Sequence, residues 1–203
     1  MKLLVTAFEP FGGDAMNASG EILRALPDAL GTLRLETLCL PVSFRAAPRA
    51  AIAAAERLRP DAIVCLGQAG GRDRLTPERI AVNRMDAARP DNDGFQPVDA
   101  PVVPGGPKSY ASALPVEAMT EAMRAAGVPA DLSDSAGTYV CNCLMYALLH
   151  RTRTRGPEIP CGFLHLPYLE EQRPPEGTPS LPKETVLRGV LAALETLNGG
   201  GCR

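Results

Sequence analysis

The chain has 203 residues, of which 45% are hydrophobic and 22% are charged, and its formal net charge is −2. A chain of this length and composition can bury one full core, so we expect residues 1–203 to form a single domain. The slight negative charge provides no basic surface for nucleic acid or for an anionic membrane. No apolar run is long enough to span a bilayer, and the run at residues 3–8 is too short for a signal peptide.

The first part of the chain alternates strands and helices. The apolar patterns predict strands at residues 2–8, 33–40 and 61–67 and an Ala-rich helix at residues 44–58. A further helix is predicted between the first two strands, with Asn17 or Ser19 as its N-terminal cap. Its apolar face is expected to consist of Ile22, Leu23, Leu26 and Leu30. This order of elements is typical of a layered α/β domain.

The middle of the chain is rich in loops. Gln68 and three glycines follow the third strand, and open α/β sheets bind their ligands at this end of their strands. An alternating segment that starts at Glu78 predicts a strand with Ile80 and Val82 facing inward. Residues 86–114 are rich in Pro, Gly and Asp, which indicates a functional loop or a small hairpin.

Three further elements are predicted in the second half. A helix begins at Pro115 and ends at Gly127, and an apolar strand covers residues 161–166. This strand places His165 at its C-terminal end. The last helix follows Ser180, and Gly199 is expected to end it.

Another helix is predicted just after Gly137, because Val140, Leu144 and Leu148 recur every four residues. Cys141 then lies in its first turn, where unpaired N–H groups and the positive end of the helix dipole favour a thiolate. A thiol in this position is a candidate nucleophile. The alternative is that Cys141 is a small buried apolar residue, as most free cysteines are.

The six cysteines are scattered along the chain, and we expect reduced thiols in a cytoplasm. Cys141 and Cys143 do not have the C-x-x-C spacing of zinc and redox sites, and no histidine pair completes a metal site. His150 follows the apolar part of the Cys141 helix beside three arginines, so we expect it at the surface or as a C-terminal cap.

Cys141, His165 and Glu78 together supply the three groups of a thiol hydrolase: a nucleophile, a proton acceptor and a carboxylate that fixes the imidazole. Each residue alone is a weak signal, because a lone histidine at a strand end is more often structural. We expect the three to converge at one end of the sheet. The combination favours a cysteine hydrolase.

Four sequence blocks resemble the pyroglutamyl-peptidase I (pyrrolidone-carboxylate peptidase) family of cysteine peptidases. They are TAFEPFGG with Asn17, GQAGGRDRLTPERIAVN, SDSAGTYVCN and GFLHLPYLEEQ, in the same order and at similar spacing over nearly the whole chain. The resemblance implies a three-layer α/β/α sandwich around a mixed, mostly parallel sheet. It also implies a cytosolic homo-oligomer, a dimer or tetramer, that acts on pyroglutamyl peptides and needs no cofactor.

The resemblance assigns the catalytic roles residue by residue. Cys141 matches the nucleophile, His165 the general base and Glu78 the carboxylate of the triad. Two positions near Cys141 depart from the family pattern: Asp134 stands where Asn is usual, and Cys143 stands where His is common. Neither position carries chemistry in the family.

Substrate-binding residues follow from the same resemblance. Phe8 and Phe11 match the aromatic pair that encloses the pyroglutamyl ring. Asn17 matches a loop asparagine, and Gln68 matches a position whose backbone reads the ring amide. The family reads D-A-R-x-P-D-N after the Glu78 segment, whereas this chain reads D-A-A-R-P-D-N. Arg89 therefore lies one residue later than the family arginine near the oxyanion, and it either replaces that arginine or is a solvated loop residue.

Two other functions stay open at this point. A cysteine amidase of the same architecture would act on another small cyclic or acylated amide. A non-catalytic α/β module would keep the pocket and lack the chemistry. Loss of pyroglutamyl-amide hydrolysis on thiol alkylation separates an enzyme from a binding module, and a panel of acyl amides separates the two enzymes.

Overall fold

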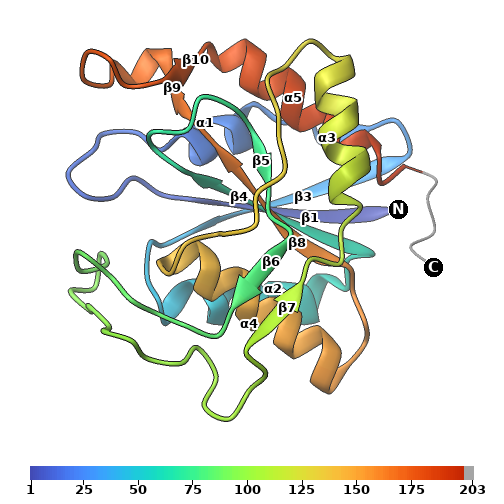
Figure 1. Cartoon of the computed structure of the whole chain (residues 1–203). Coiled ribbons are helices and arrows are strands. Elements are labelled where there is room, and N and C mark those ends of the chain that lie inside the picture. Colours follow the sequence, from blue (N-terminus) through green and yellow to red (C-terminus); the bar gives the residue numbers. More distant parts are fainter. Residues whose placement is uncertain (199–203) are drawn as a thin grey trace.

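A six-stranded sheet forms the centre of the protein, described here from a computed structural model over residues 1–198 (Figure 1). Its strands are β1 (Lys2–Phe8), β2 (Ala29–Leu30), β3 (Leu33–Leu40), β4 (Ala62–Gln68), β5 (Thr76–Pro77) and β8 (Cys161–Leu166). They lie in the order β2-β3-β1-β4-β8-β5. The inner strands run parallel to one another, and β2 and β5 pair antiparallel at the two edges. The expected mixed, mostly parallel sheet is confirmed.

Helices cover both faces of this sheet. The helices are α1 (Ala18–Ala25), α2 (Ala46–Leu58), α3 (Val116–Ala125), α4 (Val140–Arg155) and α5 (Lys183–Glu195). Helices α1, α3 and α5 lie on one face, and α2 and α4 lie on the other (Figure 1). The three-layer α/β/α sandwich is therefore confirmed. Within residues 1–198, no helix is long and apolar enough to cross a membrane.

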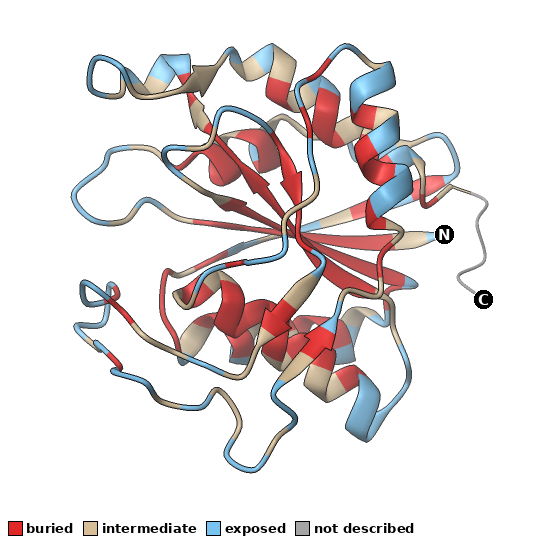
Figure 2. Cartoon of the chain, in the orientation of Figure 1, coloured by how far each residue is buried: buried red, intermediate tan, exposed pale blue. Residues whose placement is uncertain are grey.

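The hydrophobic core lies between the sheet and each helical layer (Figure 2). Successive side chains of a strand point to opposite faces, so Leu3 and Val5 of β1 face one layer and Leu4 faces the other. The strands β1, β4 and β8 are buried along nearly their whole length, as expected of parallel strands covered on both sides. Backbone pairing then fixes their relative positions and sets Gly67 beside His165.

The apolar stripe of α4 is buried as predicted, but the helix is longer than expected. It continues to Arg155, so His150 and the arginines that follow lie inside the helix rather than after it. The Nδ1 atom of His150 lies 2.9 Å from the hydroxyl of Tyr110, and its ring stacks on Tyr146. The predicted capping role for His150 was wrong, because α4 continues to Arg155. Its half-buried ring packs against Tyr110 of the hairpin strand at residues 109–111 and against Tyr146, one turn earlier in α4.

Two predicted apolar faces also differ from the structure. Leu26 is the C-terminal cap of α1, and Leu30 lies in β2, so the helix is shorter than its apolar spacing indicated. In β6 (Ile80–Val82) the central residue Ala81 is fully buried, whereas Ile80 and Val82 are half-buried. The alternation was read in the wrong phase because β6 lies outside the main sheet and turns Ala81 toward the core beneath α4.

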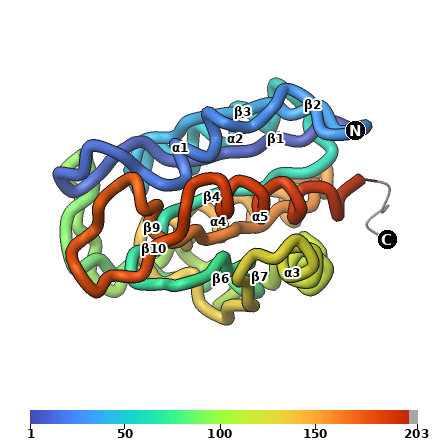
Figure 3. Tube along the Cα trace, turned by 90° about the horizontal axis from the view of Figure 1, so that it is seen from above, coloured from blue at the N-terminus to red at the C-terminus, as the bar shows by residue number. Residues whose placement is uncertain are grey.

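Residues 86–114, expected to form a functional loop or a small hairpin, contribute one strand of a hairpin whose other strand is β6, before this region. Strand β7 (Ser109–Ala111) pairs antiparallel with β6. Figure 3 shows this pair together with α3 at the side of the molecule opposite β2 and β3. The loop between β6 and β7 places Asp86, Ala88 and Arg89 near the C-terminal ends of the central strands.

The segment between β8 and α5 starts at the C-terminal end of β8 and contains only short elements. Its elements are β9 (Tyr168–Leu169), the 3-10 helix η1 (Glu170–Gln172) and β10 (Ser180–Leu181). Ser180 therefore lies in a strand, and Pro182 is the residue that caps α5. The predicted helix end at Gly199 lies outside the described residues, and α5 ends earlier, at Glu195.

Candidate active site

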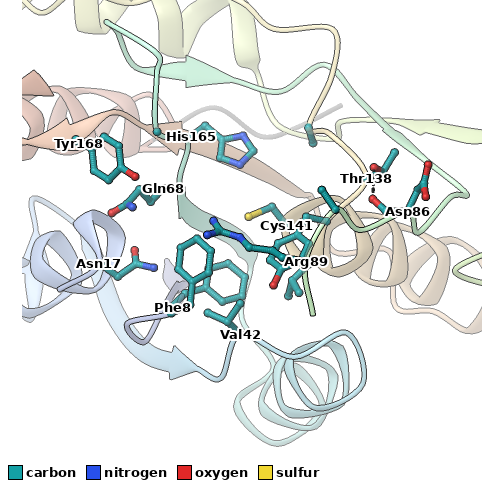
Figure 4. A pocket seen from close by; sticks show the side chains of 16 residues that line it. Phe8, Asn17, Val42, Gln68, Asp86, Arg89, Thr138, Cys141, His165 and Tyr168 are labelled. Atoms are coloured by element: carbon teal, nitrogen blue, oxygen red, sulfur yellow. Dashed lines mark hydrogen bonds between the residues drawn. The ribbon is translucent and has the colours of Figure 1, made fainter. Parts of the chain in front are cut away.

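A cavity of about 430 Å³ lies at the C-terminal ends of β1, β4 and β8 (Figure 4). It is lined by seven of the eight residues predicted from the sequence: Phe8, Phe11, Asn17, Gln68, Arg89, Cys141 and His165. The eighth, Glu78, lies behind His165 and is fully buried. The structure therefore brings together side chains from the first strand, two central strands, a helix start and two loops.

His165 is held by Glu78. Its Nδ1 atom lies 2.7 Å from Oε1 of Glu78, and both side chains are almost completely inaccessible to solvent. The Glu78 residue itself lies between β5 and β6, where its backbone N–H donates to the carbonyl of Phe163. With Nδ1 occupied in this way, Nε2 is the ring nitrogen available to a group in the cavity.

Cys141 is the second residue of α4 and projects into the cavity (Figure 4). The cap residue Tyr139 makes no side-chain hydrogen bond to the first helical turn. The first backbone N–H groups of the helix are thus left for a ligand, because no carbonyl lies one turn before them. On its other side the Sγ atom packs against Gly67, which has no side chain to displace it.

The resting state of the thiol differs from the expectation drawn from its position. Burial raises the pKa of Cys141 to about 12, and the negative charge of Glu78 acts in the same direction. The helix start alone therefore does not produce a standing thiolate, because loss of solvation outweighs it. A thiol in this environment becomes a nucleophile only if a nearby group accepts its proton.

His165 lines the same cavity as Cys141 and is the candidate for this acceptor. Burial lowers the pKa of His165 below its usual 6.5, against the opposing effect of Glu78, so the imidazole is neutral and can accept a proton. Burial acts to raise the pKa of Glu78, but the hydrogen bond from His165 and the positive charge of Arg72 act in the opposite direction and the net shift is downward. The pKa of Glu78 therefore lies below its usual 4.5, and the carboxylate is ionised beside a neutral imidazole and a neutral thiol.

The two predicted phenylalanines have different environments. Phe8 is buried, and its ring centroid lies 6.4 Å from that of Phe163 in the core. Phe11 is half-buried at the mouth of the cavity, 6.2 Å from the ring of Tyr139. The guanidinium carbon of Arg89 lies 4.6 Å from the centroid of the Phe11 ring, a cation–π arrangement. One ring thus belongs to the rigid floor of the cavity and the other to its edge.

Asn17 and Gln68 are tied to the backbone around the cavity. Asn17 caps α1 by accepting a hydrogen bond from the N–H of Ser19, and its amide donates to the carbonyl of Glu9. The Oε1 atom of Gln68 accepts hydrogen bonds from the N–H of Ala18 and from Nε2 of Gln172. Since its oxygen is engaged, the orientation of the Gln68 amide is fixed.

Sequence reasoning missed several residues that line the cavity. Val42, Thr138, Tyr139 and Tyr168 all contribute to its wall. Tyr139 and Tyr168 lie within the motif blocks, close to Cys141 and His165, and this proximity was the only available signal. Whether these residues line the cavity depends on how the loops pack against one another, and the hydrophobic periodicity of single segments does not predict this packing.

Asp86, an acidic residue, also lines the cavity. Its carboxylate lies 2.7 Å from Nη2 of Arg84, so its charge is compensated. Within residues 1–198, no cluster of three or more His, Cys, Asp or Glu side chains is placed to hold a metal ion. A second cavity of about 570 Å³, between the C-terminal ends of α2 and α4, contains none of the predicted residues.

An α/β/α sandwich with a thiol, an imidazole and a carboxylate at one cavity has the architecture of a cysteine hydrolase. The family model described as pyroglutamyl peptidase matches residues 1–199. A pyrrolidone-carboxylate peptidase from Levilactobacillus brevis is 45% identical over 198 residues, covering 97% of both chains. One from Thermococcus onnurineus is 42% identical over 196 residues, covering 97% of this chain and 98% of the relative.

Solved structures agree with the sequence relatives. The crystal structure of pyroglutamyl peptidase I from Bacillus amyloliquefaciens matches with a TM-score of 0.91 and 38% identity, covering 95% of this chain and 94% of that one. A mutant pyrrolidone carboxyl peptidase from P. furiosus matches with a TM-score of 0.93 and 38% identity, covering 98% and 99%. The chain belongs to the pyroglutamyl peptidase family of cysteine peptidases.

Proposed function

We propose that this protein is an exopeptidase that hydrolyses the amide bond after an N-terminal pyroglutamyl residue, with Cys141, His165 and Glu78 as its catalytic residues. The proposal rests on family membership and on the cavity that holds Cys141 and His165 beside Phe8 and Phe11. A thiol without a neighbouring base would be unreactive here, because burial raises the pKa of Cys141 to about 12.

Acylation begins when the Cys141 thiol transfers its proton to Nε2 of His165 as sulfur attacks the pyroglutamyl carbonyl carbon. The imidazolium that forms is stabilised by Glu78 through Nδ1. The developing oxyanion meets the N–H groups at the start of α4. The C–N bond then breaks, and the departing amine takes the proton from His165.

Deacylation uses the same groups in reverse. His165 removes a proton from water, and the hydroxide adds to the thioester carbon. The C–S bond breaks, pyroglutamate leaves, and the sulfur regains its proton from the imidazolium. Cys141, His165, Glu78 and water account for every bond and proton that moves in the two steps.

Ring recognition follows from the chemistry of the cavity. A pyroglutamyl residue has a neutral five-membered lactam in place of a free amino terminus, so apolar faces suit it better than a carboxylate does. Phe8 and Phe11 supply such faces, and the backbone beside Gln68 supplies amide groups for the lactam. Arg89 reaches the same cavity and is proposed to act on the carbonyl oxygen or on the Phe11 side of the ring.

The cellular setting is also proposed. The cysteines at positions 39, 65, 141, 143 and 161 are free thiols, which agrees with a reducing cytoplasm. We propose one domain per chain and a homo-oligomer, a dimer or tetramer, in solution. Size-exclusion chromatography with light scattering tests the assembly.

The function is tested with a fluorogenic pyroglutamyl amide. Wild-type protein should hydrolyse it, and Cys141→Ala should abolish turnover. Cys143→Ala is the matched control, because Cys143 lies on the same helix turn but is buried beside the carbonyl of Phe44, away from the cavity. Equal loss in both variants would refute Cys141 as the nucleophile. Hydrolysis of other acyl amides but not of pyroglutamyl amides would indicate an amidase, and no hydrolysis would indicate a binding module.

A further inference from the structure

Arg72 contacts Glu78 and does not line the cavity. It lies in the loop after β4, and its Nη1 atom is 2.7 Å from Oε1 of Glu78. The same nitrogen also donates to the hydroxyl of Thr76, and Nη2 donates to the carbonyl of Ser135 at 3.0 Å. Arg72 therefore links Glu78 to the strand before it and to the loop that leads into α4.

One carboxylate oxygen serves two donors. Oε1 of Glu78 accepts from Arg72 and from Nδ1 of His165, each at 2.7 Å. Within residues 1–198, Oε2 of Glu78 accepts no hydrogen bond. Arg72 and His165 thus hold the carboxylate between them, and the fully buried Glu78 has one permanently charged partner, a guanidinium whose side chain is 29% exposed.

The charges around the nucleophile explain why this partner matters. Glu78 and Arg72 are the charged groups that act on Cys141 and His165 from the elements around them. Proton transfer from Cys141 to His165 creates a thiolate and an imidazolium. With Glu78 and Arg72 both charged, these four groups carry no net charge, whereas without Arg72 they carry one uncompensated negative charge beside the thiolate.

We propose that Arg72 is a positioning residue for catalysis, which fixes the Glu78 carboxylate toward His165 and balances its charge at the Cys141 thiol. This inference rests on the proposed function of Cys141, His165 and Glu78. Arg72 does not line the cavity, so it acts on the rate of acylation and not on substrate binding.

The test compares Arg72→Gln, Arg72→Lys and Arg74→Gln. Arg74 is the matched control, since it lies in the same loop but pairs with Asp73 and Asp131. Arg72→Gln should lower kcat with a pyroglutamyl amide by roughly a hundredfold, the lower range for general acid–base catalysis, with KM within about twofold. Arg74→Gln should leave both constants near those of the wild type.

The pH profile separates this role from a purely structural one. Activity requires a neutral His165, so it is lost as the pH falls through the pKa of that histidine. Arg72 lowers the pKa of His165, after the larger effect of burial, and its loss should move the acid limb of kcat to higher pH. Arg72→Lys keeps the positive charge but cannot make all the hydrogen bonds of the guanidinium to Thr76, Glu78 and Ser135. The acid limb should therefore lie near its wild-type position, while kcat should lie between those of Arg72→Gln and the wild type.

A measurement without substrate distinguishes a failure of this inference from a failure of the proposed function. The rate of Cys141 alkylation by iodoacetamide, followed by mass spectrometry, should fall by about tenfold in Arg72→Gln and stay unchanged in Arg74→Gln. If the wild type does not hydrolyse the amide, the proposed function fails while alkylation still tests Arg72. Unchanged alkylation, together with an unmoved acid limb in a folded Arg72→Gln variant, would overturn the role of Arg72.

Discussion

Gly67 and Cys141 are in contact across the boundary between β4 and α4. A Cβ atom at position 67 would lie 3.1 Å from Sγ of Cys141 and 2.5 Å from the ring of Phe163. We therefore expect Gly67→Ala to displace the ring and the sulfur together, with a loss of about 1–3 kcal/mol in the free energy of unfolding and a fall in kcat. Urea denaturation and steady-state kinetics measure the two effects.

The Gly67 prediction has an internal control. Replacing Phe163 by Leu in the Gly67→Ala chain removes the closer obstacle, so part of the lost stability should return. A Gly67→Ala variant with wild-type stability and wild-type kcat would show that Phe163 and Cys141 can move aside without cost, and would refute the prediction.

The ring pocket is tested by Phe11→Ala. Phe11 is half-buried at the cavity edge, so its loss should weaken substrate binding by about 1–3 kcal/mol, seen as a higher KM, with little change in stability. Phe95→Ala is a matched control, because Phe95 is also half-buried and also lies beneath an arginine, Arg45, but outside the cavity. Its KM should stay unchanged.

Phe8 is expected to behave differently from Phe11. It is 3% exposed and packs on Phe163, so Phe8→Ala should cost about 3–5 kcal/mol of stability as well as weaken binding. If Phe8→Ala and Phe11→Ala lower only the melting temperature and leave the kinetic constants alone, the rings do not form the substrate pocket.

Arg89 is tested for the role of the displaced family arginine. Within residues 1–198 its guanidinium makes no hydrogen bond and lies in the cavity over Phe11, so it is available to the substrate. We expect Arg89→Ala to lower kcat by roughly a hundredfold, as for a lost oxyanion donor, and to change KM less. The exchange of Ala88 and Arg89 restores the family order and should recover part of kcat. A kcat within about twofold of wild type in Arg89→Ala would refute the role of Arg89 at the oxyanion and leave only its contact with the Phe11 ring.

Stability should decrease in acid in two stages. Because the pKa of His165 in the folded chain lies below its usual 6.5, the unfolded chain binds a proton that the folded chain does not, and stability falls as the pH drops below about 6.5. The pKa of Glu78 also lies below its usual 4.5, so a second loss follows below about 4.5. Denaturant unfolding at several pH values measures both stages.

Histidine variants assign the first stage. His165→Asn should remove it, whereas His150→Asn should keep it, because His165 is then intact. A His165→Asn variant with the same acid profile as the wild type would show that other groups cause the loss.

The elements that carry the site could be predicted because their patterns are local. The apolar runs of residues 2–8 and 161–166 and the four-residue spacing from Val140 are properties of single segments, and parallel strands bring their C-terminal ends to one edge. The convergence of Cys141 and His165 at one cavity followed from these elements. Their assignment to chemistry came from the motif blocks.

The remaining features depend on the environment that the folded chain creates. The phase of the Ile80 segment was misread because β6 pairs outside the main sheet. The helix start at Cys141 indicated a thiolate, but burial and the charge of Glu78 reverse the direction of its pKa. Arg72 lay within a recognised block, yet its contact with Glu78 depends on how the loop after β4 folds back. The strand phase, the pKa and the contact all depend on burial from solvent and on contacts between segments that are distant in the sequence.

The floor and the rim of the cavity come from structurally different parts of the protein. Phe8, Gln68 and His165 lie on adjacent strands whose register is fixed by backbone pairing, whereas Phe11 and Arg89 lie on loops at the edge. Changes to the loops can therefore alter the rim of the cavity without moving His165. Grafting residues 86–106 from a relative would replace Arg89 and its neighbours at the rim and leave the strands that carry Phe8, Gln68 and His165 unchanged.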